Sequence, residues 1–170
     1  MRIFGIILTT LFLALQVNLF GQIESEAYEK KLDKLYTYSV PLISAEQLAF
    51  ELERNPRIVV LDTRQANEYK VSHLADSRFV NYNQFKLEDV KDIPKDAKVV
   101  VYCSVGYRSE RIGEKLQKAG YENVYNLYGG IFEWVNQENA VVDNEGTPTQ
   151  TVHTYNKLWS QWLQKGEKVW

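Results

Sequence analysis

The stretch from Lys98 to Gln117 reads KVVVYCSVGYRSERIGEKLQ and contains the only cysteine of the chain, Cys103. Its first residues form a short apolar run rich in valine, which is typical of a strand buried on both faces of a sheet. The residues after the cysteine include Gly106 and Arg108 and lead into a pattern of helical period. We therefore expect a strand, a short loop that holds the cysteine, and a helix.

Comparable units precede and follow this stretch. The run RIVVLDTR at residues 57–64 is also short, apolar and β-branched, so it predicts a second strand buried on both faces. Further patterns predict strands at residues 78–82 and 122–127, and helices at residues 44–55, 66–74, 83–90, 107–120 and 129–137. Alternating strands and helices predict an α/β fold, with a parallel sheet and helices on both of its faces.

The composition fits one soluble domain. The chain has 170 residues, of which 45% are hydrophobic and 25% are charged. This length is enough for one domain with a proper core and short for two. The net charge of −2 and the lack of a basic block argue against nucleic-acid binding. Two histidines and one cysteine are too few for the usual four protein ligands of a zinc site.

The first residues have the pattern of a targeting segment. Arg2 provides a short positive region, residues 3–15 are apolar, and the small residue Gly21 offers a cleavage point. A membrane anchor is the alternative, but polar residues interrupt the run before it reaches the ~20 apolar residues that a span needs. We therefore expect a signal peptide at residues 1–21 and an exported bacterial protein, periplasmic or secreted. No stable membrane span is expected after cleavage.

The rest of the chain divides into three parts. Residues 22–43 form a charged, amphipathic lead of helical character, residues 44–140 form the main domain, and residues 141–170 comprise a polar linker and an aromatic tail. The tail sequence YNKLWSQWLQKGEKVW places three apolar residues where one helical stripe would bury them: Leu158, Trp162 and Leu163. We expect the tail to pack on the domain, and a surface for a partner protein is the alternative.

Export makes a single cysteine informative. Cysteines of exported proteins usually come in pairs, because their surroundings are oxidising. A lone thiol has no internal partner, so Cys103 is either a small buried hydrophobe or a reactive group.

The position of Cys103 favours the reactive alternative. It follows a strand of a parallel sheet, and ligands bind beyond the carboxyl ends of such strands. It precedes a helix whose first N–H groups are unpaired and attract negative charge. Gly106 permits a backbone conformation that a side chain would obstruct, and Arg108 adds a positive charge. These features favour the thiolate, which is the nucleophile. We assign Cys103 as the catalytic residue and the loop after it as the binding site for an anion: Ser104, Val105, Gly106, Tyr107, Arg108 and Ser109.

Other polar residues are given supporting roles. Asp62 and Arg64 end their strand on the same sheet edge as Cys103, so we expect them to support the loop by an ion pair or hydrogen bonds. A purely structural salt bridge is the alternative. His73 is expected to form hydrogen bonds near the site rather than to act as a base, because a stabilised thiolate needs none. His153 is expected to take no part in catalysis.

The chain resembles a single-domain rhodanese. The active-site half of that family is similar to YCSVGYRSERIGEKLQKAGYENVYNLYGGIFEW, in which Gly129 and Gly130 precede Trp134. The upstream half is similar at Asp62, Arg64, Glu68, Tyr69 and His73. The likeness spans roughly Ser44–Gln137. It departs where the family has a glycine before the histidine and a proline-glycine-alanine run after it: here these places hold Ser72, Ala75, Asp76 and Ser77.

The resemblance implies a sulfurtransferase that carries sulfur as a persulfide on Cys103. The loop amides and Arg108 would hold the thiolate, the persulfide and a small anionic donor such as thiosulfate. The acceptor would be cyanide, a thiol or a protein, and no metal or organic cofactor is implied.

Two other functions stay open. Phosphatases and arsenate reductases of the same fold place one more residue between cysteine and arginine, whereas four residues separate Cys103 from Arg108 here. The shorter loop favours a single sulfur atom over a tetrahedral phosphoryl group. A module that carries sulfur or docks a partner without turnover is the other alternative.

Overall fold

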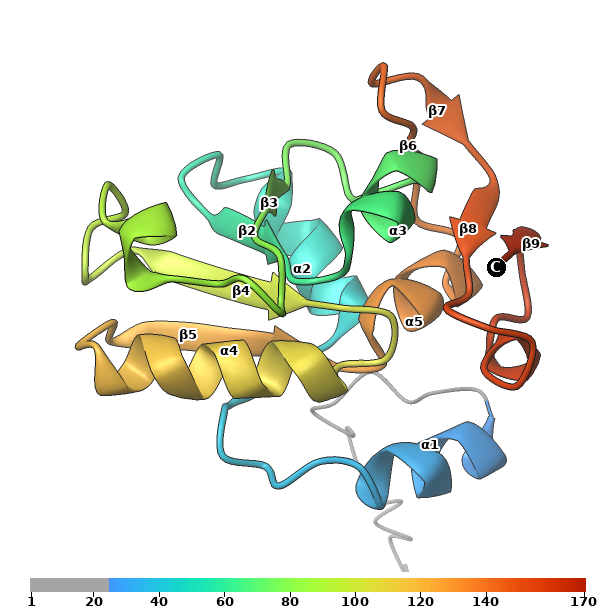
Figure 1. Cartoon of the computed structure of the whole chain (residues 1–170), viewed down its shortest axis with the longest axis horizontal. Helices are drawn as coiled ribbons and strands as arrows, with labels where there is room; N and C mark the ends of the chain where they lie inside the picture. Colours follow the sequence, from blue (N-terminus) through green and yellow to red (C-terminus); the bar gives the residue numbers. More distant parts are fainter. Residues whose placement is uncertain (1–24) are drawn as a thin grey trace, which may run out of the picture.

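A parallel five-stranded sheet runs through the centre of the protein (Figure 1). The computed structural model describes residues 25–170, so the signal peptide predicted at residues 1–21 lies outside the described residues. The strands are β1 (Leu42–Ile43), β2 (Val59–Asp62), β3 (Arg78–Phe79), β4 (Lys98–Tyr102) and β5 (Asn123–Leu127). They lie in the order β1-β5-β4-β2-β3, and every pairing is parallel.

Helices cover both faces of this sheet. They are α1 (Glu26–Asp33), α2 (Ala45–Leu52), α3 (Ala66–Val71), α4 (Tyr107–Lys118) and α5 (Gly130–Asn136), with a 3-10 turn η1 (Leu87–Val90). Successive side chains of a strand point to opposite faces. In β4, Val99 and Val101 therefore pack in the core under α4, whereas Val100 and Tyr102 pack in the core under α2 and α5. The predicted α/β architecture is confirmed.

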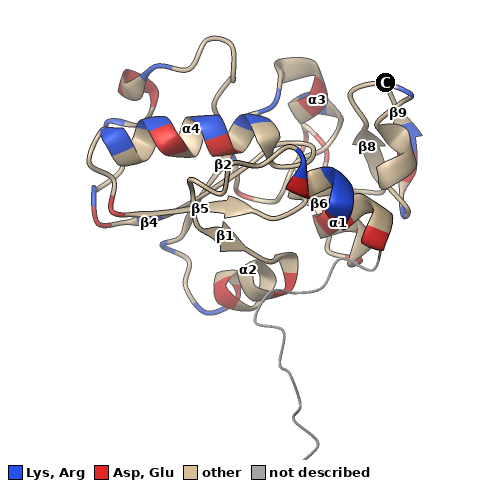
Figure 2. Cartoon of the chain, turned by 90° about the horizontal axis from the view of Figure 1, so that it is seen from below, with Lys and Arg blue, Asp and Glu red and all other residues tan. Residues whose placement is uncertain are grey.

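The helices begin and end at the signals present in the sequence. Ser44 caps α2, since its Oγ accepts a hydrogen bond from the Gln47 N–H at 3.1 Å. Gly120 follows the end of α4 with a φ of 87°, a left-handed conformation that glycine adopts without strain. Ile112 and Leu116 of α4 are fully buried, while charged residues of both signs follow its outer face (Figure 2). The amphipathic pattern therefore orients α4 on the sheet.

The polar stretch after α5 is more ordered than a linker. β6 (Val141–Val142) and β7 (Pro148–Thr149) form an antiparallel pair, closed by a turn in which Asp143 Oδ1 accepts the N–H groups of Glu145 and Thr147 at 2.9 Å. Val142 also bridges to His73 at the end of α3. The strands are only two residues long, so they leave no alternating pattern in the sequence.

The aromatic tail packs on the domain without forming the helix that its pattern indicated. It contains β8 (Thr151–His153), a 3-10 turn η2 (Ser160–Trp162) and β9 (Glu167–Val169), with β8 and β9 parallel. Trp162 stacks on Tyr28 of α1 with ring centroids 5.4 Å apart, and Leu163 is fully buried. Leu158 is 78% exposed, so the prediction that one helical stripe buries all three residues is wrong. The tail instead has an extended path, along which local contacts with α1 and α5 decide which residues are buried.

Candidate active site

Cys103 lies in the loop that joins the central strand β4 to the helix α4. Its sulfur accepts a hydrogen bond from the Gly106 N–H at 3.1 Å. Gly106 is the residue before the first turn of α4 and has a φ of 93°. This conformation turns its N–H back toward the start of the loop. A partly negative sulfur is therefore stabilised by an amide at the positive end of the α4 dipole.

The other side of the loop is held by groups that bind its carbonyl oxygens. The Cys103 carbonyl accepts the Ile131 N–H at 2.9 Å, from the first turn of α5. The Val105 carbonyl accepts the Tyr36 hydroxyl at 2.7 Å, and that hydroxyl accepts the Gly129 N–H at 3.1 Å. These bonds fix the loop on the side away from the Gly106 N–H that bonds the sulfur.

Tyr36 was not among the predicted site residues. It lies in the charged, amphipathic lead, yet it is buried, and burial raises the pKa of its phenol well above the usual value. The hydroxyl therefore stays protonated and donates to Val105. No sequence pattern points to this contact, because the two residues are 69 positions apart.

Arg108 forms a forked ion pair with Glu68 of α3. Its two terminal nitrogens each lie 2.7 Å from a carboxylate oxygen of Glu68. Burial works against both charges, but the hydrogen bonds between them outweigh it, so the pKa of Arg108 is raised and that of Glu68 is lowered. The positive charge that Arg108 was predicted to add to the loop is thus largely balanced by a carboxylate. Glu68 is one of the residues that carry the family resemblance, which implied no role for it.

The remaining loop residues divide between the pocket and the core. Ser104 Oγ donates to Glu68 Oε1 at 2.9 Å and accepts from Arg108 at 3.0 Å, so it joins the ion pair to the loop. Val105 and Tyr107 line the pocket in front of Cys103. Ser109 is fully buried and donates to Asn126 Oδ1 at 2.7 Å, so it fixes α4 to β5 instead of facing the pocket.

Asp62 and Arg64 form a fully buried ion pair behind the site. Arg64 Nη2 lies 2.7 Å from Asp62 Oδ2 and also donates to the carbonyl of Ser72. Desolvation opposes the charge of Arg64, but the Asp62 carboxylate outweighs it and raises the pKa of the guanidinium. The pair joins the end of β2 to the end of α3, the helix that carries Glu68. It does not line the pocket.

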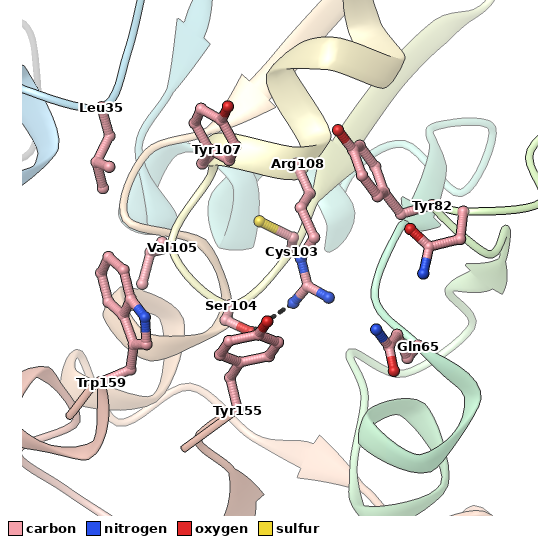
Figure 3. Close-up of a pocket in the computed structure, with 11 residues that line it drawn as sticks. Leu35, Gln65, Tyr82, Cys103, Ser104, Val105, Tyr107, Arg108, Tyr155 and Trp159 are labelled. Atoms are coloured by element: carbon pink, nitrogen blue, oxygen red, sulfur yellow. Dashed lines mark hydrogen bonds between the residues drawn. The ribbon is translucent and has the colours of Figure 1, made fainter. Parts of the chain in front are cut away.

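A pocket of about 440 Å³ opens in front of Cys103 (Figure 3). Four parts of the chain close it besides the cysteine loop: the lead, the start of α3, the segment after β3, and the tail. The side chains that they contribute are Leu35, Gln65, Tyr82, Asn83, Tyr155 and Trp159. Figure 3 shows the Cys103 sulfur near the centre, with Trp159 on one side and Tyr82 on the other.

A family model described as the rhodanese-like domain matches residues 44–137, more than half of the chain. The chain belongs to the rhodanese-like family. The resemblance inferred from the cysteine loop is thereby confirmed, and its predicted extent agrees with the matched residues.

Two relatives of this rhodanese-like chain have names that describe sulfur transfer. A protein named adenylyltransferase and sulfurtransferase uba4, from Ogataea parapolymorpha, is 34% identical over 95 residues, which are 56% of this chain and 23% of that protein. The thiosulfate sulfurtransferase GlpE of Coxiella burnetii is 31% identical over 87 residues, which are 51% of this chain and 79% of that protein. This chain thus spans about a quarter of the first relative and most of the second.

The fold agrees with that of solved rhodanese structures. A rhodanese-related protein from Thermoplasma volcanium superposes with a TM-score of 0.53 at 28% identity, over 60% of this chain and 97% of that one. The lead before residue 44 and the tail after residue 137 lie outside the matched family region. Both nevertheless contribute to the pocket wall of this rhodanese-like chain.

Neither of the two histidines lines the pocket. The His73 ring stacks on Tyr69 with centroids 3.8 Å apart, and its Nδ1 lies 3.0 Å from the Tyr69 carbonyl. His153 Nδ1 accepts the Tyr155 N–H at 3.0 Å, and its Nε2 lies 3.1 Å from the Asn67 side chain. Burial lowers the pKa of His153, so this ring is held neutral at physiological pH. Through these two contacts, His153 joins the tail to α3. In the described residues, no cluster of His, Cys, Asp and Glu is placed to hold a metal ion.

Replacing Glu68 by glutamine is expected to destabilise the fold by about 1–3 kcal/mol at neutral pH, because Arg108 loses its counter-charge. The pKa of Glu68 lies below 4.5 in the folded chain. Its contribution is therefore complete above pH 4.5 and is lost as the pH falls through the lowered value. Urea unfolding of both proteins between about pH 7 and pH 3 measures this difference, which should shrink on acidification.

The matched control is Glu26→Gln, which breaks an exposed ion pair with Lys30 within one helix. We expect no measurable change in stability from it, because exposed pairs contribute little. A loss for Glu68→Gln that stayed constant down to the lowest pH would show that the ion pair with Arg108 is not its source.

Proposed function

We propose that this rhodanese-like chain is a sulfurtransferase that moves sulfane sulfur from thiosulfate or a similar small donor to a thiophilic acceptor. The observation that carries the proposal is the Cys103 sulfur, which faces an open pocket and accepts the Gly106 N–H at the start of α4. The name of the GlpE relative, a thiosulfate sulfurtransferase, supports the choice of donor. Cys103 would carry the sulfur as a persulfide.

The reaction would be a double displacement. The Cys103 thiolate attacks the outer sulfur of thiosulfate, the S–S bond of the donor breaks, and sulfite leaves with the electron pair. The acceptor, which is cyanide, a thiol or a protein, then attacks the same outer sulfur, and Cys103 leaves as the thiolate. No oxidant or reductant is consumed, because each step exchanges one nucleophile for another at the same outer sulfur.

In both steps, the amides of the cysteine loop would contribute most of the electrostatic stabilisation of the negative charge on the sulfur. The Gly106 N–H is already bonded to the sulfur, whereas the charge of Arg108 is shared with Glu68. Ser104 links that ion pair to the loop and would keep it in place while the charge on the sulfur changes. Arg108 would therefore contribute mainly to the shape and the electrostatic potential of the pocket, and less to direct binding of the donor.

Intact mass spectrometry of the purified protein tests the proposal. Incubation with thiosulfate is expected to add the mass of one sulfur atom, and cyanide is expected to remove it with formation of thiocyanate. Phosphate release from an aryl phosphate without any gain of sulfur would support the phosphatase alternative instead. Sulfur uptake without turnover by any acceptor would support a carrier module.

We also propose that the chain is exported, on the basis of the apolar segment at residues 3–15. Among the residues that the structure describes, no helix is long and apolar enough to cross a bilayer. Protein recovered from the native envelope or medium is expected to begin near Gln22. N-terminal sequencing measures this, and soluble cytoplasmic protein that retains Met1 would contradict it.

A further inference from the structure

Four of the eleven residues that line the pocket around Cys103 are aromatic: Tyr82, Tyr107, Tyr155 and Trp159. Of these, Tyr107 and Tyr155 are 42% and 49% exposed. The volume of about 440 Å³ falls within the ~300–1,000 Å³ of pockets that bind organic molecules. A small inorganic anion would leave most of this space and most of the aromatic surface without a partner.

The charges of the pocket give an anionic sulfur acceptor no advantage over a neutral one. Within the described residues, Arg108 is the only lysine or arginine of the pocket lining, and its guanidinium is paired with Glu68. Together with a Cys103 thiolate, these groups carry a net negative charge. A neutral acceptor therefore meets less electrostatic repulsion in the pocket than an anionic acceptor would.

The aromatic wall is held in position by the packing of the tail. Trp162 stacks on Tyr28, and the adjacent Leu163 is fully buried, so the η2 turn is anchored to the domain. The backbone N–H of Trp159 lies 3.1 Å from the Asn156 side-chain oxygen, and Lys31 lies over its ring. The His153 contacts hold the chain before Tyr155. Tyr155 and Trp159 lie outside the matched family region, so this part of the wall belongs to the chain's own tail, whereas Tyr82 and Tyr107 lie within that region.

We infer that the sulfur acceptor is a neutral thiol that carries an aromatic or apolar group. This inference rests on the proposed sulfurtransferase function. The acceptor thiol attacks the outer sulfur of the Cys103 persulfide anion and passes its proton to that sulfur, so a new S–S bond forms and the bond to Cys103 breaks. The products are an organic persulfide and the Cys103 thiolate, which accepts a hydrogen bond from the Gly106 N–H. Meanwhile the organic group packs between Trp159, Tyr155 and Tyr82.

Alkylation of Cys103 tests the pocket without any sulfur chemistry. We would compare iodoacetamide with N-benzyl iodoacetamide, each rate being divided by that of free cysteine. Contact of one benzyl group with the aromatic wall is expected to raise the corrected rate about tenfold. Trp159→Ala, or Tyr155→Ala if the first variant folds poorly, should bring the ratio toward one. Trp170→Ala is the matched control, since this tail residue is 63% exposed and absent from the pocket lining, and it should keep the full ratio. Equal corrected rates in the wild type would overturn the inference.

Sulfur transfer from the loaded protein tests the acceptor itself. Benzyl thiol is expected to remove sulfur from Cys103 about tenfold faster than 2-mercaptoethanol, with loss of this preference in Trp159→Ala and not in Trp170→Ala. Equal rates would overturn the acceptor class. A protein that alkylates with the benzyl preference but never gains sulfur from thiosulfate or an organic persulfide would contradict both the proposed function and the acceptor role. The alkylation ratio separates that outcome from a wrong assignment of the pocket.

Discussion

Cys103→Ser is expected to abolish sulfur uptake from thiosulfate and all formation of thiocyanate. An alcohol is far less ionised than a thiol at neutral pH, and it does not hold a transferable sulfur. Cys103 is the only cysteine of the chain, so no neighbouring thiol can take over. The measurement is the intact mass after thiosulfate treatment, together with a thiocyanate assay.

The fold should survive this substitution. The serine oxygen remains within the reach of the Gly106 N–H, and the carbonyl contacts to Tyr36 and Ile131 do not involve the side chain of residue 103. Near-UV circular dichroism and the thermal midpoint should therefore stay close to wild type. Cys103→Ala provides a second variant in which no hydroxyl needs a partner. Turnover of thiosulfate by either variant would place the sulfur-carrying group elsewhere.

The centre of the fold could be predicted because its signals are local. β4 is a continuous apolar run, and α4 has a buried stripe that ends at Gly120. The position of Cys103 between them follows from their order in the sequence. A strand, a loop and a helix that are adjacent in sequence need no knowledge of distant contacts.

The surroundings of the cysteine loop could not be predicted in the same way. The partner of Arg108 is 40 residues away, and the hydroxyl that fixes Val105 is 69 residues away. Neither Glu68 nor Tyr36 differs, by residue type or spacing, from the charged and aromatic residues of ordinary surface helices. Only the packing of α1 and α3 beside the carboxyl edge of the sheet gives them their roles.

The conformation of the tail could not be predicted from the spacing of its apolar residues. Its spacing of Leu158, Trp162 and Leu163 indicated a helix, but the chain runs through a 3-10 turn between two short strands. A tail that packs on a finished domain takes the conformation that the surface of the domain selects, and tertiary contacts override a weak local preference. The sequence therefore suggested that the tail would pack, but not which residues would face the pocket.

Gly106→Ala is expected to destabilise the protein by about 2–5 kcal/mol and to lower kcat/KM for thiosulfate about a hundredfold. Gly106 has a φ of 93°, where any side chain costs about 1–2 kcal/mol. A Cβ atom would also lie 1.9 Å from the Tyr36 hydroxyl oxygen. That hydroxyl cannot simply move aside, since it is buried and bonds both the Val105 carbonyl and the Gly129 N–H. The loop must shift instead, and the donor to the Cys103 sulfur shifts with it.

Gly120→Ala separates the two causes of this loss. Gly120 has a φ of 87°, nearly the same backbone conformation, but a Cβ atom there would meet nothing within 4 Å. Its replacement should therefore cost only the conformational part, about 1–2 kcal/mol, and should leave the kinetics of sulfur transfer unchanged. Urea unfolding and steady-state kinetics of the two variants, measured side by side, give the difference due to Tyr36. The contrary result is that Gly106→Ala loses no more stability than Gly120→Ala and keeps its activity. That result would show that the contact between Tyr36 and the loop does not fix the geometry around Cys103. It would also show that the amide of residue 106 is not the group that holds the sulfur.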